Sequence, residues 1–252
     1  MNLRFFVQKH NSQQQFIINA ASNIGLFLIN VLIGMWFVPF LILHLGVAAY
    51  GLVPLTTTLT SYLSLLTLSL NGAMGRFLTI ELKNGEFSTA NRIFNTTLFT
   101  SFGLSGLVLF ISLIIVSATP KLFNIPVGQE IEAQALLGLV ALSFVVTTIE
   151  SNFSVSTWAL NRFDIRNGWA LMSRLVQVSI VGLLFSFLDA HLWYVGFGIL
   201  CAALASFAGS VLIWRYLTPQ LSINLRLFDR FQLRQLTGMS GWMFINQVGS
   251  LL

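Results

Sequence analysis

The sequence predicts an all-α membrane protein, a polytopic bundle of six complete transmembrane helices followed by the start of a seventh. Asp, Glu, Lys and Arg make up only 8% of the 252 residues, whereas a soluble globular chain carries about 25%. Apolar residues make up 56% of the chain, and the mean hydropathy is +0.81. No charged residue occurs between Lys9 and Arg76. These observations leave too little polar surface for a water-soluble fold, so the bilayer is the expected solvent.

The predicted spans follow from the length of each apolar stretch, because a helix needs about 20 residues to cross roughly 30 Å of hydrocarbon. The uncharged N-terminal stretch is long enough for two spans, with a turn between Leu43 and Gly51. Charged or Pro- and Gly-containing segments, such as 83–86 and 120–128, separate the later spans. The six predicted spans are residues 16–43, 51–76, 92–118, 133–160, 166–188 and 192–216.

The chain divides into three parts in this interpretation. Residues 1–217 form an N-terminal six-helix transmembrane lobe, and residues 218–235 form an amphipathic linker along the cytoplasmic interface. The apolar stretch at residues 236–252 is barely long enough to span the membrane. We therefore expect it to begin the second lobe of a longer chain. The alternative is a short, tilted seventh helix.

The basic residues indicate the orientation of the chain, because cytoplasmic loops are enriched in Lys and Arg. With a cytoplasmic N-terminus, Lys121 alone falls on the outer side, and Arg174 lies within a span. The cations on the cytoplasmic side are then Arg4, Lys9, Arg76, Lys83, Arg92, Arg162, Arg166, Arg215, Arg226, Arg230 and Arg234. This asymmetry predicts that the N-terminus is cytoplasmic.

Glu150 and Arg174 are the first candidates for functional residues, because the turn between the fourth and fifth spans places both at similar membrane depth. Trp158 and Trp169 flank the same turn, as an interfacial aromatic belt would. An ionised side chain at a helix centre costs roughly 2.5–3.5 kcal/mol. Three interpretations stay open. The two residues form a structural ion pair, or Arg174 reaches back to the interface, or Arg174 receives an anionic substrate while Glu150 holds it or exchanges a proton.

A stripe of amide side chains marks the first span. Gln15, Asn19, Asn23 and Asn30 fall within roughly 80° of one another at about 100° per residue. Such amides either bond to a neighbouring helix or line a water-filled cavity. The second span carries hydroxyl side chains at residues 56–58, 60 and 61, and we expect these to bond to their own backbone carbonyls.

The sequence contains no pattern typical of an enzyme or a metal site. His10, His44 and His191 are scattered, and Cys201 is the single cysteine. The paired acidic residues at positions 130 and 132 point to different faces of a helix end, which does not suit glycoside hydrolysis. We expect no enzymatic activity, no cofactor and no nucleic-acid partner.

Three groups of residues carry a resemblance to a known family. The first lies between the first two spans: Leu45-Gly46, Tyr50-Gly51-Leu52, Tyr62-Leu63-Ser64-Leu65-Leu66 and Leu70-Asn71-Gly72-Ala73-Met74-Gly75-Arg76. The second is Asn84-Gly85-Glu86 with Asn91-Arg92-Ile93-Phe94-Asn95-Thr96-Thr97-Leu98, and the third is Leu160-Asn161-Arg162-Phe163-Asp164 with Asn167 and Arg174. Together they resemble the N-terminal part of polysaccharide-export flippases of the multidrug/oligosaccharidyl-lipid/polysaccharide (MOP) exporter superfamily.

That resemblance implies two six-helix lobes around a central cavity that opens alternately to each side of the bacterial inner membrane. The substrate class is a polyprenyl-diphosphate-linked oligosaccharide, an O-antigen, capsule or exopolysaccharide repeat unit, moved from the cytoplasmic to the outer leaflet. Membrane lipid, a polysaccharide polymerase and chain-length machinery are the further partners implied. The cavity candidates in this chain are Arg174, Glu150, Asn19, Asn23, Asn30 and Arg76. The alternatives are an ion-coupled drug or metabolite antiporter of the same superfamily and a non-transporting membrane scaffold for polysaccharide assembly.

Overall fold

The computed structural model describes residues 12–122, 125 and 128–249, and this part of the chain is helical with no β-strand. Each long helix corresponds to one of the apolar stretches expected from the sequence. The helices are α1 (Ser12–Leu45), α2 (Val47–Tyr50), α3 (Leu52–Asn84), α4 (Phe87–Leu122), α5 (Glu130–Ala159), α6 (Phe163–Phe187), α7 (Trp193–Leu217) and α8 (Arg230–Gly249), with the short 3₁₀ helix η2 (Leu225–Leu227) before α8. The chain is therefore all-α, as predicted.

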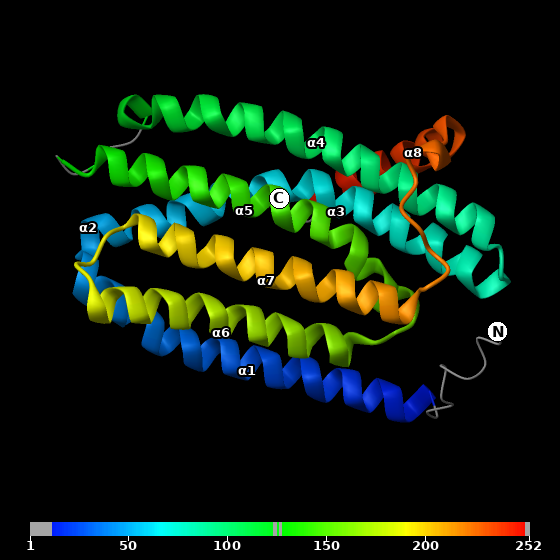
Figure 1. Ribbon diagram of the computed structural model, residues 1–252, viewed down its shortest axis with the longest axis horizontal. Helices are drawn as coiled ribbons and strands as arrows, with labels where there is room; N and C mark the ends of the chain where they lie inside the picture. The colour runs from blue at the N-terminus through cyan, green and yellow to red at the C-terminus, as the bar shows by residue number, and fades with distance from the viewer. Residues whose placement is uncertain (1–11, 123–124, 126–127, 250–252) are drawn as a thin grey trace.

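The long helices lie side by side in a bundle in which chain order and spatial order differ (Figure 1). Helix α7 packs between α5 and α6, and its contact with α5 is the most extensive in the bundle. Helix α6 then separates α7 from α1, whose contacts are to α6 and to the short α2. Helices α3 and α4 cover the other side of α5, and α8 packs on both of them. Helix α1 is thus an edge of the bundle.

Within the described residues, five helices are long and apolar enough to cross a membrane, and these are α1, α4, α5, α6 and α7. Helices α2 and α3 together pass the same test as a single sixth span. That span is bent by 48° within α3, between its parts Val47–Ser64 and Ser69–Asn84. The protein is therefore a multi-pass membrane protein, with five candidate spans in its described part, or six with the bent one. The sequence predicted a second span at residues 51–76 and gave no sign of this bend.

Two glycines mark the C-terminal ends of α1 and α3. Gly46 has a φ of 80° and separates α1 from α2, and Gly85 has the same φ after the last residue of α3. Residues with a side chain adopt this left-handed conformation rarely, so glycine is the natural residue at both turns. The main-chain N–H of Glu86 donates to the carbonyl of Glu81 at 3.0 Å, which closes the end of α3.

Small residues let α7 approach its neighbours closely. A β-carbon at Gly209 would overlap the ring of Trp169 on α6. A β-carbon at Gly198 would overlap the side chain of Val181, which is also on α6. Aromatic packing fixes the other face of α7, where Trp214 stacks on Phe94 of α4 with ring centroids 5.2 Å apart. Lipid tails are as apolar as these side chains, so close packing of this kind is what holds membrane helices together.

Helix α8 runs across the boundary that the sequence analysis placed at residue 236. The predicted boundary between a linker at 218–235 and a new apolar segment at 236 falls inside one continuous helix, α8, which begins at Arg230. Leu236 is fully buried against α3 and α4 with Met239 and Met243 beside it. Residues 218–229, which include η2, connect α7 to α8. The assignment of the later residues to a second lobe stays a prediction.

Candidate functional site

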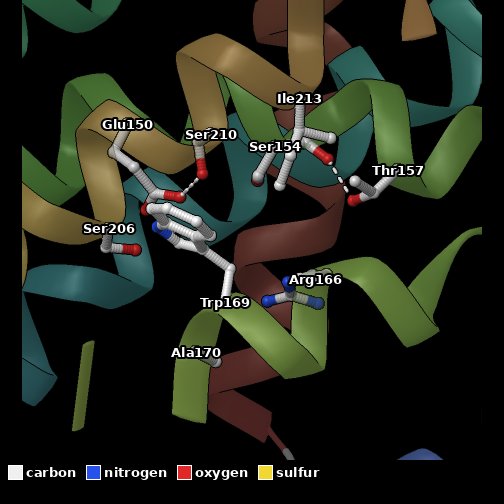
Figure 2. A pocket seen from close by; sticks show the side chains of 9 residues that line it. All are labelled: Glu150, Ser154, Thr157, Arg166, Trp169, Ala170, Ser206, Ser210 and Ile213. Carbon is white, nitrogen blue, oxygen red and sulfur yellow. Dashed lines mark hydrogen bonds between the residues drawn. The ribbon is translucent and has the colours of Figure 1, made fainter. Parts of the chain in front are cut away.

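A polar cavity of about 120 Å³ lies where α5, α6 and α7 meet. Figure 2 shows Glu150 from α5 beside Ser206 and Ser210 from α7, with Arg166 and Trp169 contributed by α6. Ser154, Thr157, Ala170 and Ile213 complete the lining. All three helices are among the membrane-spanning ones, so the cavity is a polar space inside an apolar bundle.

Glu150 is held by a hydroxyl group rather than by a cation. The side-chain hydroxyl of Ser210 donates a short hydrogen bond to Oε1 of Glu150. Within the described residues the ion pairs are Arg92–Asp229, Arg162–Asp164 and His191–Glu132, and none of them includes Glu150. The guanidinium of Arg166 lines the same cavity but lies over the ring of Trp158, with its carbon 5.2 Å from the ring centroid.

Trp169 belongs to the interior of the bundle and not to an interfacial belt, which corrects the prediction. Its indole N–H donates to the carbonyl oxygen of Ala205 on α7 at 2.9 Å, and its ring lies on Gly209. Trp158 is 52% exposed, as an interfacial residue would be. The sequence signal for the inward placement of Trp169 was Gly209 on α7, because a glycine there leaves room for a ring on α6.

Arg174 lies near the middle of α6, about 17 Å from Phe163 at a rise of about 1.5 Å per residue. Its Nη1 donates to Oε1 of Gln177 at 2.6 Å, and its guanidinium lies over the ring of Phe37 on α1, 5.6 Å from the centroid. The structure therefore places Arg174 at the α1–α6 contact, beside uncharged partners.

The ion pair between Glu150 and Arg174, one of the three interpretations left open, is absent from the described structure. The prediction assumed that α5 and α6 lie against each other as a hairpin along their whole length. Instead α7 packs between them, so Glu150 faces α7 and Arg174 faces α1 (Figure 1). Sequence spacing indicates depth along each helix, but it carries no information on which helix lies alongside.

The amide stripe of α1 bonds to the turn between α5 and α6, and we call this contact the α1 seam. Nδ2 of Asn19 donates to the carbonyl oxygen of Asn161 at 3.0 Å, and Oδ1 of Asn19 accepts from the N–H of Asp164 at 3.3 Å. One turn later, Oδ1 of Asn23 accepts from Nδ2 of Asn167 at 2.6 Å. Gln15 joins the seam through a hydrogen bond of 3.2 Å to Asp164. The interpretation of these amides as interhelical contacts is confirmed for this part of the stripe.

The remaining cavity candidates lie apart from these residues. Asn30 is exposed on α1, and Arg76 is exposed on α3. Neither lines the cavity around Glu150. The hydroxyl groups of the second span bond to their own backbone as predicted, for example Thr56 to the carbonyl of Val53 at 2.8 Å.

A second set of amides, quoted above only as part of the family resemblance and not as site candidates, holds the linker against α4. We call this contact the α4 clamp. The amide of Asn91 bonds to the carbonyl of Gln220 at 2.9 Å and to the N–H of Ser222 at 2.7 Å. The amide of Asn95 bonds to the carbonyl of Ser222 at 2.8 Å and to the N–H of Asn224 at 2.7 Å. The spacing of four residues between the two asparagines was the signal available in the sequence.

The linker ends in a charged cap at the start of α8. The N–H of Asp229 donates to the hydroxyl of Thr96 at 3.0 Å, and its carboxylate accepts from Arg92 at 3.2 Å and from the N–H of Phe231 at 2.8 Å. These donors, led by the N–H of Phe231, lower the pKa of Asp229 below its usual value. Asp229 is therefore the N-terminal cap of α8 and also fixes it to α4.

The arrangement has the features of a membrane bundle with polar groups turned inward. No group of three His, Cys, Asp or Glu side chains that could hold a metal ion occurs among the described residues. The fold and these inward polar groups define a multi-pass helical membrane protein.

Comparison with known proteins found a similar membrane protein. The chain is 26% identical, over 238 residues, to a Bacillus subtilis (strain 168) protein described as "Uncharacterized membrane protein EpsK". The match covers 94% of this chain and 47% of that protein, so the chain spans about half the length of the curated relative. No protein-family model matches the chain. No solved structure matches it either.

Proposed function

We propose that the protein is part of a carrier that moves a polyprenyl-diphosphate-linked oligosaccharide from the cytoplasmic to the outer leaflet of a bacterial inner membrane. The proposal is supported by the family resemblance of its three motifs and by the similarity of nearly the whole chain to a membrane protein of about twice its length. A sugar diphosphate cannot cross hydrocarbon unaided, so a carrier has to offer it polar groups within the membrane.

The observation that carries the proposal is the environment of Arg174. This cation lies near the middle of a membrane-spanning helix, and the partners described for it are the neutral amide of Gln177 and the ring of Phe37. A buried cation costs roughly 2.5–3.5 kcal/mol at a helix centre and is retained where it pairs or serves a substrate. A guanidinium with its charge unbalanced suits a diphosphate, which it binds through two parallel hydrogen bonds.

The orientation proposed is a cytoplasmic N-terminus. Arg92, Arg162, Arg166 and Arg215 lie at the ends of α4, α5, α6 and α7 that this orientation directs to the cytoplasm. The α1 seam and the α4 clamp lie at the same end of the bundle (Figure 1). The head group would enter from this end, while the lipid tail stays among the acyl chains.

The test is export in cells that depend on the complete protein. Arg174→Ala should lower surface display of the saccharide about tenfold or more, since a charge-assisted hydrogen bond contributes about 1.5–3 kcal/mol. Arg174→Lys should retain part of the activity, because it keeps the charge but loses the bidentate geometry. Arg234→Ala, a matched change at an exposed cation on α8, should leave export unchanged. Normal export by Arg174→Ala at normal protein level would reduce Arg174 to a structural residue.

An ion-coupled antiporter of the same superfamily is the second candidate function, and the cavity around Glu150 is the observation that favours it. A carboxylate in a membrane-embedded cavity is the usual residue for exchange of a small cation. Export of a small organic cation against a proton gradient by the purified protein, with no movement of lipid-linked saccharide, would select this alternative.

A further inference from the structure

We propose that the connection between α7 and α8 carries a binding surface for the head groups of anionic phospholipids, which we call the linker surface. It consists of Ile223, Leu225, Arg226, Arg230 and Phe231. The two arginines hold a lipid phosphate, and the three apolar side chains lie among the first carbons of the acyl chains. This surface is separate from Arg174 and from the cavity around Glu150, so the proposal does not depend on the proposed function.

The linker surface lies at the level of the helix ends and not beyond them. The α4 clamp bonds residues 218–229 to Asn91 and Asn95, which are about 6 Å and about 12 Å from the start of α4 at a rise of about 1.5 Å per residue. Figure 1 shows this connection beside α4, while the turn between α3 and α4 extends farther in the same direction. With 36 residues, α4 exceeds the length of about 20 that crosses hydrocarbon, so its first turns lie among the head groups.

Large apolar side chains project outward from this connection. Leu225 is 69% exposed, Phe231 is 64% exposed and Ile223 is 54% exposed. The α4 clamp fixes the main chain here, and Leu221 already fills the inward position against the core, so these three side chains have no place inside the bundle. Such a concentration of exposed apolar side chains marks contact with an apolar phase or a partner.

The arginines of the linker surface carry positive charge that no described carboxylate balances. Arg226 and Arg230 are exposed, and neither takes part in an ion pair among the described residues. The acidic side chain between them, Asp229, already accepts from Arg92 and from the N–H of Phe231. A guanidinium binds a phosphate through two parallel hydrogen bonds. The charge of this surface therefore complements an anionic head group.

The opposite end of the bundle is equally apolar but has the other charge. Phe187 is 80% exposed where α6 ends, and Ile131 is 81% exposed where α5 begins. The charged residues beside them in the sequence are acidic, Asp189 near the first and Glu130 and Glu132 on either side of the second. Acidic neighbours repel an anionic head group. The contrast assigns anionic lipid to the linker surface and supplies an internal control.

A phospholipid fits this surface better than a soluble anion does. A free phosphate could contact the two guanidinium groups, but it would leave Leu225 and Phe231 exposed to water. A phospholipid covers both kinds of side chain at once. The start of α8 does not by itself provide an anion site, because the carboxylate of Asp229 already accepts from a main-chain N–H there.

Site-directed fluorescence quenching in vesicles tests the linker surface. In a Cys201→Ala background, Leu225→Cys carries a fluorophore, and the full chain is placed in phosphatidylcholine vesicles in which a fixed fraction of the lipid is brominated. Brominated phosphatidylglycerol should quench the label more than the same fraction of brominated phosphatidylcholine, because the anionic lipid is enriched beside it. Arg226→Gln and Arg230→Gln should each lower this enrichment about fivefold, the factor that one basic side chain contributes at an anionic surface.

Matched controls separate a binding site from a general effect of charge. Lys83→Gln removes an exposed cation at the same end of the bundle and should leave the enrichment unchanged. A label at Phe187→Cys, at the opposite end, should show no preference for phosphatidylglycerol. Arg226→Lys keeps the charge and should retain most of the enrichment.

Four results would overturn the proposal. Equal quenching of the Leu225→Cys label by the two brominated lipids would show that no anionic lipid is enriched. A loss in Lys83→Gln as large as that in Arg226→Gln would reflect net charge and not a site. Loss of the preference in millimolar inorganic phosphate would assign the surface to a soluble anion. Displacement by an equimolar amount of polyprenyl diphosphate would assign it to the transported lipid.

Discussion

The α1 seam and the α4 clamp use the same chemistry at the same end of the bundle but differ in how firmly they bind. Each has two asparagines four residues apart, Asn19 and Asn23 on α1 and Asn91 and Asn95 on α4. In the α4 clamp the amides bind main-chain groups at 2.7–2.9 Å, and Asn95 is 0% exposed. In the α1 seam several bonds join two side chains, and Asn23 is exposed.

This difference indicates which junction is fixed and which can separate. Water can replace an exposed side-chain hydrogen bond at small cost, whereas the buried amide of Asn95 would lose about 1–3 kcal/mol if it were left unpaired. Helix α1 also packs on fewer helices than α4 does. We therefore expect the linker and α8 to move with α4 as one body, while α1 is able to move relative to α6.

The largest effect is expected in the α4 clamp. Asn95→Ala removes a fully buried amide and its two hydrogen bonds to the linker main chain, at Ser222 and Asn224. At about 1 kcal/mol for each hydrogen bond, the free energy of unfolding should fall by about 2 kcal/mol. Thermal unfolding in detergent measures the change, and Asn30→Ala, an exposed asparagine in α1, is the control. Equal stability of the two variants would remove the distinction between the junctions.

A smaller effect is expected for Asn19→Ala in the α1 seam. This side chain is 6% exposed, but its bonds are longer, at 3.0–3.3 Å, and the adjacent Asn161 is exposed. We expect a loss of about 1.5 kcal/mol in the same assay, and faster hydrogen exchange of the main chain at residues 161–164. A loss larger than that of Asn95→Ala would reverse the ranking.

Asn23→Ala should have a smaller effect still. Its amide is exposed and accepts one described hydrogen bond, from Asn167, which also donates to the hydroxyl of Ser22 at 3.0 Å. Water and Ser22 can satisfy Asn167 in the variant, so the loss should be about 0.5 kcal/mol. Denaturant titration of the two variants Asn23→Ala and Asn19→Ala would show whether the hydrogen bonds of the α1 seam contribute less at Asn23 than at Asn19. A loss equal to that of Asn19→Ala would argue for a rigid seam.

The smallest change is a local effect of pH on the cap of α8. Because the pKa of Asp229 is lowered, its contribution is fully present above the pKa of the unfolded chain and is lost as the pH falls through the lowered folded pKa. The main-chain N–H of Phe231 should therefore exchange faster in acid. Asp229→Asn should remove this acid dependence, and an unchanged dependence in that variant would assign it to another group.

The positions of the spans could be predicted from the sequence, but their neighbours could not. Hydropathy located α1 and α4–α7 to within several residues, because each has to cross hydrocarbon. The packing of α7 between α5 and α6 depends on Gly209 and Trp169 fitting together, which no periodicity encodes. For the same reason the pairing of Glu150 with Ser210 was missed, although Ser206 and Ser210 lie one helical turn apart on α7.

The central claim of the proposed function is that the diphosphate reaches Arg174, so position 174 should be accessible from water and not buried among the acyl chains. In a Cys201→Ala background, Arg174→Cys should react with a membrane-impermeant thiol reagent, and lipid-linked saccharide should slow the reaction. Leu183→Cys, at an exposed apolar position on the same helix, should not react. A position 174 as unreactive as position 183 would contradict the account.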